Sequence, residues 1–173
     1  MAAKLAEKLV GAFSGLLALK YGKHLIVFII SLMPILELRG GLIAASLLGM
    51  DPVESYIVTI LGNIIPIPFI LWLINGILKW MRESKIRFLN SFANWLYAKV
   101  DKHKGQIEKY GFWGLVLFVG IPLPGTGAWT GCLIAAVLNM DKKKAMLAAL
   151  IGVFMASIIM MLVSFGIIGN LIR

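Results

Sequence analysis

The chain has 173 residues, of which 60% are hydrophobic and 14% are charged, and its mean hydropathy is +0.92. A soluble domain is closer to half apolar and a quarter charged, so this composition excludes an ordinary soluble fold and indicates lipid as the solvent. The net charge of +9 does not indicate nucleic acid, because the basic residues flank apolar stretches instead of forming one basic face.

The first 22 residues predict an N-terminal amphipathic helix. Within residues 4–20, Lys4, Glu7 and Lys8 alternate with apolar residues, which suits a helix lying at the membrane interface. A short tilted entry into the membrane is the alternative. A retained helix is favoured over a signal peptide, because Glu7 interrupts the pattern and no small-residue cleavage site follows.

An apolar stretch at residues 25–36 is too short to cross a bilayer. Its 12 residues span roughly 18 Å as a helix, whereas the hydrocarbon core is about 30 Å thick. The charged, glycine-rich sequence Glu37-Leu38-Arg39-Gly40-Gly41 follows, and then a second short apolar piece at residues 42–50. We therefore predict a re-entrant hairpin whose second half-helix begins near Gly41.

The first full-length span is predicted at residues 56–78. Pro66 lies inside it, and because proline lacks a backbone donor we expect a kink at residues 64–69, with Asn63 bonding the freed backbone. Residues 79–109 carry eight lysines and arginines among apolar residues at helical spacing, which predicts a basic interfacial linker helix. A solvated connector is the alternative.

The second half of the chain repeats the first. A half-length piece at 112–121, a break at Pro122-Leu123-Pro124-Gly125-Thr126-Gly127, a second piece at 128–140 and a span at 145–168 follow in the same order. A shift of 90 residues aligns seven identities between positions 31 and 62 and their counterparts. Each unit would cross the membrane once, which predicts an inverted repeat of residues 24–78 and 110–173 in one membrane domain.

Charge predicts the orientation of this domain. Residues 79–109 and 142–144 collect 11 lysines and arginines, so we expect them on the cytoplasmic side of a prokaryotic plasma membrane. The fold class is therefore an all-α integral membrane protein with interfacial amphipathic helices. Two hairpins and two spans make a thin bundle, so a homodimer surrounded by membrane lipids is expected.

The two breaks predict a binding site near the bilayer midplane. Non-helical backbone persists there only when it is buried in protein or lines a wet cavity. Helix N-termini near Gly41 and Gly127 attract anions through free N–H groups and the helix dipole. The expected substrate- or ion-binding residues are Glu37, Arg39, Gly40, Gly41, Pro124, Gly125, Thr126, Gly127, Trp129 and Thr130, and the expected structural breaks are Pro34, Asn63, Pro66 and Pro122.

Glu37 and Arg39 are the ionisable residues of this site. Glu37 is expected at the C-terminal end of its half-helix, where the dipole disfavours a negative charge, so it either pairs with Arg39 or exchanges a proton or cation. A purely structural Glu37–Arg39 pair is the alternative. Trp129 is equally consistent with packing, and Asp51 and Asp141 are expected to cap helices at the interface.

No catalytic or cofactor motif accompanies these residues. The sequence contains no nucleophile triad, phosphate-binding loop or dinucleotide fingerprint, so we expect neither an enzyme nor a cofactor. The single cysteine, Cys132, and the two separated histidines predict no metal site. The expected ligand is a small anionic or amphipathic substrate.

The stretches from Met33 to Gly41 and from Ile121 to Gly131 resemble the family of putative small multi-drug export proteins. That family is similar to a compact branch of the DedA/VTT superfamily. The resemblance implies two facing re-entrant hairpins, proton-coupled transport or lipid translocation, an acidic role for Glu37 and a basic role for Arg39. DedA proteins carry further arginines in and after the second hairpin, whereas residues 121–140 contain none. An energy-independent lipid scramblase and a non-transporting scaffold or assembly factor are the alternatives.

Overall fold

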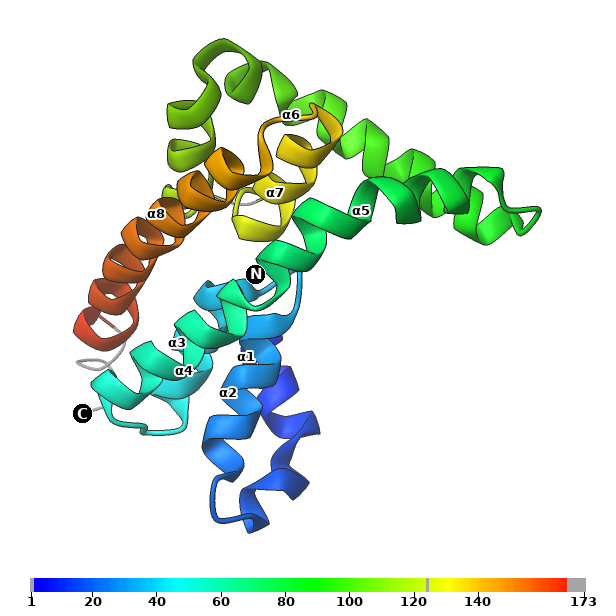
Figure 1. Cartoon of the computed structure of the whole chain (residues 1–173). Coiled ribbons are helices and arrows are strands. Elements are labelled where there is room, and N and C mark those ends of the chain that lie inside the picture. Colours follow the sequence, from blue (N-terminus) through cyan, green and yellow to red (C-terminus); the bar gives the residue numbers. More distant parts are fainter. Residues whose placement is uncertain (1, 124, 168–173) are drawn as a thin grey trace.

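The computed structural model describes residues 2–123 and 125–167, and this part of the chain is built from helices (Figure 1). The first half contains α1 (Ala2–Ala12), a short 3-10 helix η1 (Ser14–Ala18), α2 (Gly22–Leu32), α3 (Glu37–Leu47), α4 (Pro52–Ile64) and α5 (Pro66–Glu83). The second half contains α6 (Arg87–Gly120), α7 (Ala128–Val137), α8 (Lys142–Met161) and a π-helical turn η2 (Leu162–Ile167).

The N-terminal segment is two helices instead of the single predicted one. α1 ends at Ala12 and η1 begins at Ser14, because Phe13 has non-helical backbone angles (φ −94°, ψ 10°). Gly11 and Gly15 flank this point and lower the helix propensity on both sides of it. α1 packs against α3, and Ala6 is fully buried.

The first break lies earlier in the chain than the sequence suggested. α2 ends at Leu32, since Pro34 holds the preceding Met33 in an extended conformation (φ −72°, ψ 134°). α3 already begins at Glu37. The predicted helix start near Gly41 is therefore wrong, and the charged, glycine-rich sequence forms the first turns of α3.

The glycines of α3 serve helix packing. α2 and α3 lie against each other, and a Cβ atom on Gly41 would overlap the hydroxyl of Ser31 on α2. A Cβ atom on Gly40 would lie 2.5 Å from the Cβ of Leu36. Both glycines are buried, so α3 approaches its neighbours at close range without presenting these backbones to an open cavity.

Two segments in the described part of the chain are long and apolar enough to cross a membrane, Pro52–Glu83 and Lys142–Gly166. They coincide with the two spans expected from the sequence. The first is interrupted where a kink was predicted, because α4 ends at Ile64 and α5 starts again at Pro66, whose missing donor is harmless at a helix start.

The basic linker is divided between two long helices. Residues 79–83 complete α5, and the chain reverses at residues 84–86 into α6. The N-terminal part of α6 and the end of α5 form an arm that projects from the rest of the molecule (Figure 1). α6 bends sharply at Gly111 (φ 54°, ψ −123°), and its remainder packs on α7 and α8.

The same helix ending occurs twice, 90 residues apart. The N–H of Met50 donates to Ala45 O at 3.0 Å, and the N–H of Met140 donates to Ala135 O at 2.9 Å. Gly49 (φ 60°) and Asn139 (φ 53°) occupy the left-handed position of each turn, as in a Schellman motif. Asp51 and Asp141 follow and cap α4 and α8 by accepting backbone N–H groups, as the sequence indicated.

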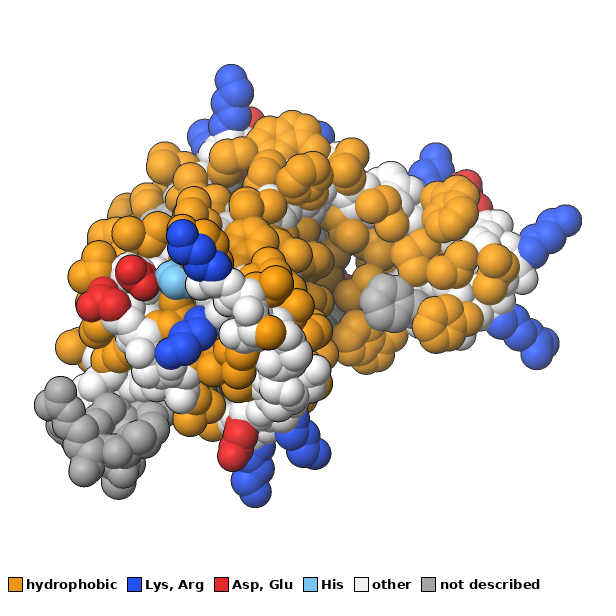
Figure 2. Space-filling view, turned by 90° about the horizontal axis from the view of Figure 1, so that it is seen from below, with side chains coloured by type: hydrophobic (Ala, Val, Ile, Leu, Met, Phe, Trp, Pro, Cys, Tyr) orange, Lys and Arg blue, Asp and Glu red, His pale blue; other side chains and the backbone are white. Residues whose placement is uncertain are grey.

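The outer surface is largely apolar. Hydrophobic side chains cover much of the face seen in Figure 2, whereas lysines and arginines project mainly from its margins. Large exposed side chains include those of Ile57, Leu61, Phe69, Trp72, Leu147 and Phe154 on α4, α5 and α8. Such continuous apolar faces suit a lipid environment better than water.

Candidate functional site

Two breaks interrupt the helices, and the start of α3, just after the first break, contacts the second. The first comprises residues 33–36, between α2 and α3, and the second comprises residues 121–127, between α6 and α7. Two side chains from the first turn of α3, Glu37 and Arg39, reach across to the second break. Segments about 90 residues apart in the sequence are thereby joined by polar contacts.

Glu37 lies at the N-terminus of α7. Its carboxylate accepts hydrogen bonds from the backbone N–H groups of Ala128 and Trp129, each at 3.0 Å, and the residue is only 5% exposed. These N–H groups have no partner within α7, and the positive end of the helix dipole stabilises the carboxylate. The expected position of Glu37 at a helix C-terminus is therefore wrong, because the residue begins α3 and caps α7.

The backbone around this contact is specialised. Glu37 has a φ of 51°, which is uncommon for a residue with a side chain and costs about 1–3 kcal/mol in general. Gly127 has a φ of 136°, and a Cβ atom on it would lie 2.2 Å from the Glu37 carboxylate. Glycine is thus required where the second break meets Glu37. Gly125 also has a positive φ, 87°.

Arg39 holds the loop of the second break. Its guanidinium donates to the carbonyl of Leu123 and, at 2.9 Å, to the hydroxyl of Thr126, with a longer contact of 3.5 Å to Ile121 O. The Thr126 hydroxyl also lies 2.8 Å from Leu123 O and 2.9 Å from Ile121 O. The donors expected to meet a ligand therefore bind carbonyl groups of the non-helical backbone, which have no partner within a helix.

The space behind this contact is closed. Glu37, Arg39, Asn63 and Ala128 surround a gap without room for a water molecule. Asn63 is 2% exposed, and its side-chain oxygen has no hydrogen-bond partner in the part of the chain that the structure describes. An unpaired buried amide oxygen costs free energy.

An apolar pocket of about 280 Å³ lies on the other side of Trp129. Pro34 and Thr130 line it together with Trp129, so three of the expected site residues share this space. The remaining lining comes from Ile35 and from side chains of α5, α6 and α7, namely Ile70, Ile74, Trp95, Leu96 and Leu133. The buried indole nitrogen of Trp129 has no partner among the described residues.

The structure thus gathers about half of the expected binding residues at one contact and places the others elsewhere. Glu37, Arg39, Thr126, Gly127 and the backbone of Trp129 form one contact between the breaks. Gly40 and Gly41 lie within α3, Pro122 follows the end of α6, and Pro66 begins α5. Pro124 lies outside the described residues. Within the described part of the chain, no group of three or more His, Cys, Asp or Glu residues could hold a metal ion.

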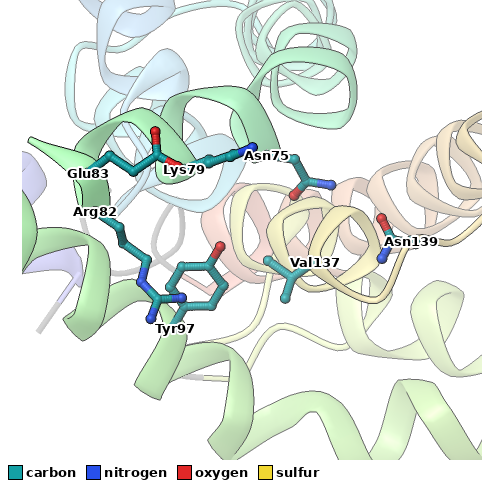
Figure 3. A pocket seen from close by; sticks show the side chains of 7 residues that line it. All are labelled: Asn75, Lys79, Arg82, Glu83, Tyr97, Val137 and Asn139. Atoms are coloured by element: carbon teal, nitrogen blue, oxygen red, sulfur yellow. The ribbon is translucent and has the colours of Figure 1, made fainter.

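Sequence analysis missed a second, polar pocket. It measures about 540 Å³ and is lined by Asn75, Lys79, Arg82, Glu83, Tyr97, Val137 and Asn139 (Figure 3). Its residues come from three helices and from the turn that follows α7. Only the pair Lys79 and Arg82, one helical turn apart at the end of a span, was a signal in the sequence.

The comparisons with known proteins bear on the same region. Residues 37–159 match the family model described as "Putative small multi-drug export protein". The match begins at Glu37 and includes the whole second break, α7 and most of α8. No curated protein and no solved structure matches the chain.

Proposed function

Because the chain belongs to the family described as "Putative small multi-drug export protein", we propose that it is a transporter that moves an anionic or amphipathic substrate between two re-entrant hairpins. The family description and the two apolar segments make it a membrane protein with an export role. The single observation that carries the finer proposal is the carboxylate of Glu37 seated on the N-terminus of α7.

The re-entrant hairpins are α2 with α3 and the end of α6 with α7. Each member is short, and the ten residues of α7 span about 15 Å, half of a hydrocarbon core. Matched contacts support a repeat of the two units. Cβ atoms on Gly41 and Gly62 would both overlap Ser31, and Cβ atoms on Gly131 and Gly152 would both overlap Val119. Gly131 follows Gly41 by 90 residues, and Gly152 follows Gly62 by the same number. Equivalent glycines thus pack equivalent helices.

The carboxylate of Glu37 occupies a site that suits any small anion. A helix N-terminus binds carboxylate or phosphate through the same N–H groups and dipole. Protonation of Glu37 removes the charge that holds it there, and an anionic substrate then takes its place. Uptake of a proton and binding of the substrate are in this way coupled at one pair of N–H groups, those of Ala128 and Trp129.

Arg39 gives the second break the positive charge that its own sequence lacks. Residues 121–140 contain no arginine, but the Arg39 guanidinium lies against Leu123 and Thr126. In the DedA/VTT superfamily, which this family resembles, the second hairpin carries its own arginines, and we propose that Arg39 takes their place in this chain. Release of these contacts would free up to five donors for an anionic substrate such as a lipid phosphate.

A flux assay tests the proposal. The protein is reconstituted into liposomes with an imposed proton gradient, and movement of amphiphilic cations, amphiphilic anions and fluorescent phospholipids is recorded. Glu37→Gln is expected to lower gradient-driven flux of the transported class at least tenfold. Glu54→Gln is the matched control, because Glu54 also lies in the first turn of a helix but is exposed and pairs with His24.

The outcomes separate the alternatives. Unchanged flux in both Glu37→Gln and Arg39→Ala would remove the contact between the breaks from the mechanism. Lipid exchange that persists after the gradient is collapsed would indicate a scramblase. The absence of any flux, together with specific co-purification of another membrane protein, would indicate a scaffold.

A further inference from the structure

A basic pocket adjoins the apolar pocket along the same three helices. α5 contributes Asn75, Lys79 and Arg82, α6 contributes Tyr97, and the end of α7 contributes Val137 (Figure 3). No residue lines both spaces, but both lie against α5, α6 and α7, and residues adjacent in sequence line them: Ile74 beside Asn75, and Leu96 beside Tyr97. Leu133 and Val137 are likewise one helical turn apart on α7.

Contacts between the three helices hold the walls of the basic pocket. The Asn75 side-chain nitrogen donates to Ala136 O at 2.7 Å and ties α5 to the last turn of α7. The Arg82 guanidinium lies 5.1 Å from the centre of the Tyr97 ring and ties α5 to α6. In Figure 3, Arg82 extends from α5 towards Tyr97. A guanidinium resting on an aromatic face is oriented while its N–H groups stay available for a ligand.

The charges of the pocket favour an anion with one net negative charge. Lys79 and Arg82 lie three residues apart on α5, and Glu83 offsets one of the two positive charges. Arginine presents a planar fork of donors that matches phosphate, and lysine adds a mobile ammonium group. The exposed side chains of both residues can approach a phosphate from one side of the pocket.

The basic pocket lies at the end of a candidate membrane span, and this position indicates which kind of molecule carries the anion. The first candidate span ends at Glu83, so Lys79 and Arg82 lie in its last turns, at the depth of lipid headgroups. The apolar pocket is lined by Ile70 and Ile74, which precede Asn75 on α5, and by Trp129 at the start of α7. A basic pocket next to an apolar pocket on the same three helices fits one molecule that has both characters.

We propose that these two pockets form one binding site for a phosphate-bearing amphiphile, with the phosphate on Lys79 and Arg82 and the apolar chain between α5, α6 and α7. This inference concerns binding alone and does not require the transport cycle proposed above. Loss of binding here and loss of flux through Glu37 are therefore separate results.

Binding to the purified protein in a neutral detergent tests the site. Native mass spectrometry records the affinity for dioctanoyl phosphatidic acid, for dioctanoylglycerol, which has the same chains without the phosphate, and for inorganic phosphate. The double variant Lys79→Gln/Arg82→Gln is expected to weaken binding of the phosphatidic acid at least tenfold. The control Lys85→Gln/Arg87→Gln removes the same charge from adjacent residues that do not line the pocket and is expected to stay within twofold.

A second variant tests the shape of the site without changing its charge. Val137→Trp fills the polar pocket from α7 and is expected to weaken binding of phosphatidic acid to a similar degree. Preserved thermal unfolding of both pocket variants shows that they fold. If one of the two pocket variants unfolds, the other one tests the site against the same Lys85/Arg87 control.

Each outcome decides the proposal. Tight, variant-sensitive binding of phosphatidic acid but not of inorganic phosphate supports a lipid ligand. If inorganic phosphate binds with the same affinity as phosphatidic acid and the pocket variants weaken its binding, the phosphate site is supported and free phosphate is its ligand. Equal binding of dioctanoylglycerol and phosphatidic acid, equal loss in the Lys85/Arg87 control, or no binding overturns the site.

Discussion

At the scale of single residues, Glu37 combines a buried carboxylate, a left-handed backbone and a bond to a helix that begins 91 residues later. The sequence predicted Glu37, Arg39, Thr126 and Gly127 as site residues because charges, hydroxyls and glycines are conspicuous at a break in an apolar chain. It did not reveal their partners. Only tertiary packing decides that Glu37 accepts from Ala128 while Arg39 donates to the loop before it.

Substitutions at Glu37 are expected to destabilise the protein in a fixed order. Glu37→Gln keeps one oxygen acceptor but removes the charge that the α7 dipole stabilises. Glu37→Ala leaves two buried N–H groups unpaired, at about 1–3 kcal/mol each. Thermal unfolding in detergent should therefore give the highest midpoint for the parent, a lower one for Gln and the lowest for Ala. Equal midpoints for the three proteins would show that the carboxylate does not cap α7.

Gly127→Ala is expected to disrupt the same contact from the other side. The added methyl group would lie 2.2 Å from the Glu37 carboxylate, on a backbone whose φ of 136° disfavours any side chain. We expect a lower unfolding midpoint and a loss of flux similar to that of Glu37→Gln. The control is Gly76→Ala within α5, where a methyl group meets no atom within 4 Å and helix propensity improves. Equal midpoints for the two alanine variants would contradict the close approach.

At the scale of helices, the sequence located the start of α7 near Gly127 but not the start of α3. The Met-Asp sequences marked the turns that follow α3 and α7, which end three residues before each methionine, because an aspartate that accepts N–H groups is a local signal for the next helix. The start of α3 was placed four residues too late, since Gly-Gly was interpreted as a break. Gly40 and Gly41 lie inside a helix because α2 and α4 pack against it closely, which is not a local property.

The aligned glycines provide a prediction at this scale. Gly41→Ala places a methyl group against Ser31 and Thr59, and Gly131→Ala places one 2.7 Å from a methyl group of Val119. Overpacking of this kind costs about 1–3 kcal/mol in a well-packed core. Both variants should therefore lower the unfolding midpoint by comparable amounts, and Gly105→Ala, with no atom within 4 Å, serves as control. A large effect in one half only would contradict equivalent packing of the two units.

At the scale of the whole molecule, composition and span count were sufficient to indicate an all-helical membrane protein. The repeat predicted two breaks that face each other near the bilayer midplane, which stays a prediction, and it did not predict the arm of α5 and α6 or the basic pocket beside it. That pocket is formed by Asn75, Tyr97 and Asn139, which are far apart in sequence and have no common pattern. The predicted homodimer stays a prediction, and a mass measurement in detergent that gives only monomer would contradict it.

The orientation in the membrane can be tested with single cysteines. Cys132 is buried and is first replaced by alanine, after which a cysteine is introduced at Lys142 or at Lys20. The charge distribution predicts that a membrane-impermeant maleimide added to the cytoplasmic side labels Lys142→Cys and not Lys20→Cys. The reverse pattern would mean the opposite orientation in the membrane. Labelling of both cysteines from one side would contradict an odd number of membrane crossings between Lys20 and Lys142.

The central claim is that the two breaks meet inside the membrane through Glu37 and the start of α7. Solid-state NMR of the labelled protein in lipid bilayers measures this directly, as magnetisation transfer from the amide nitrogens of Ala128 and Trp129 to the carboxyl carbon of Glu37. The N–H to carboxylate distances of 3.0 Å predict strong transfer from both nitrogens, with Glu37 shielded from bulk water. Absence of this transfer, with the Glu37 carboxyl in contact with bulk water, would contradict the account.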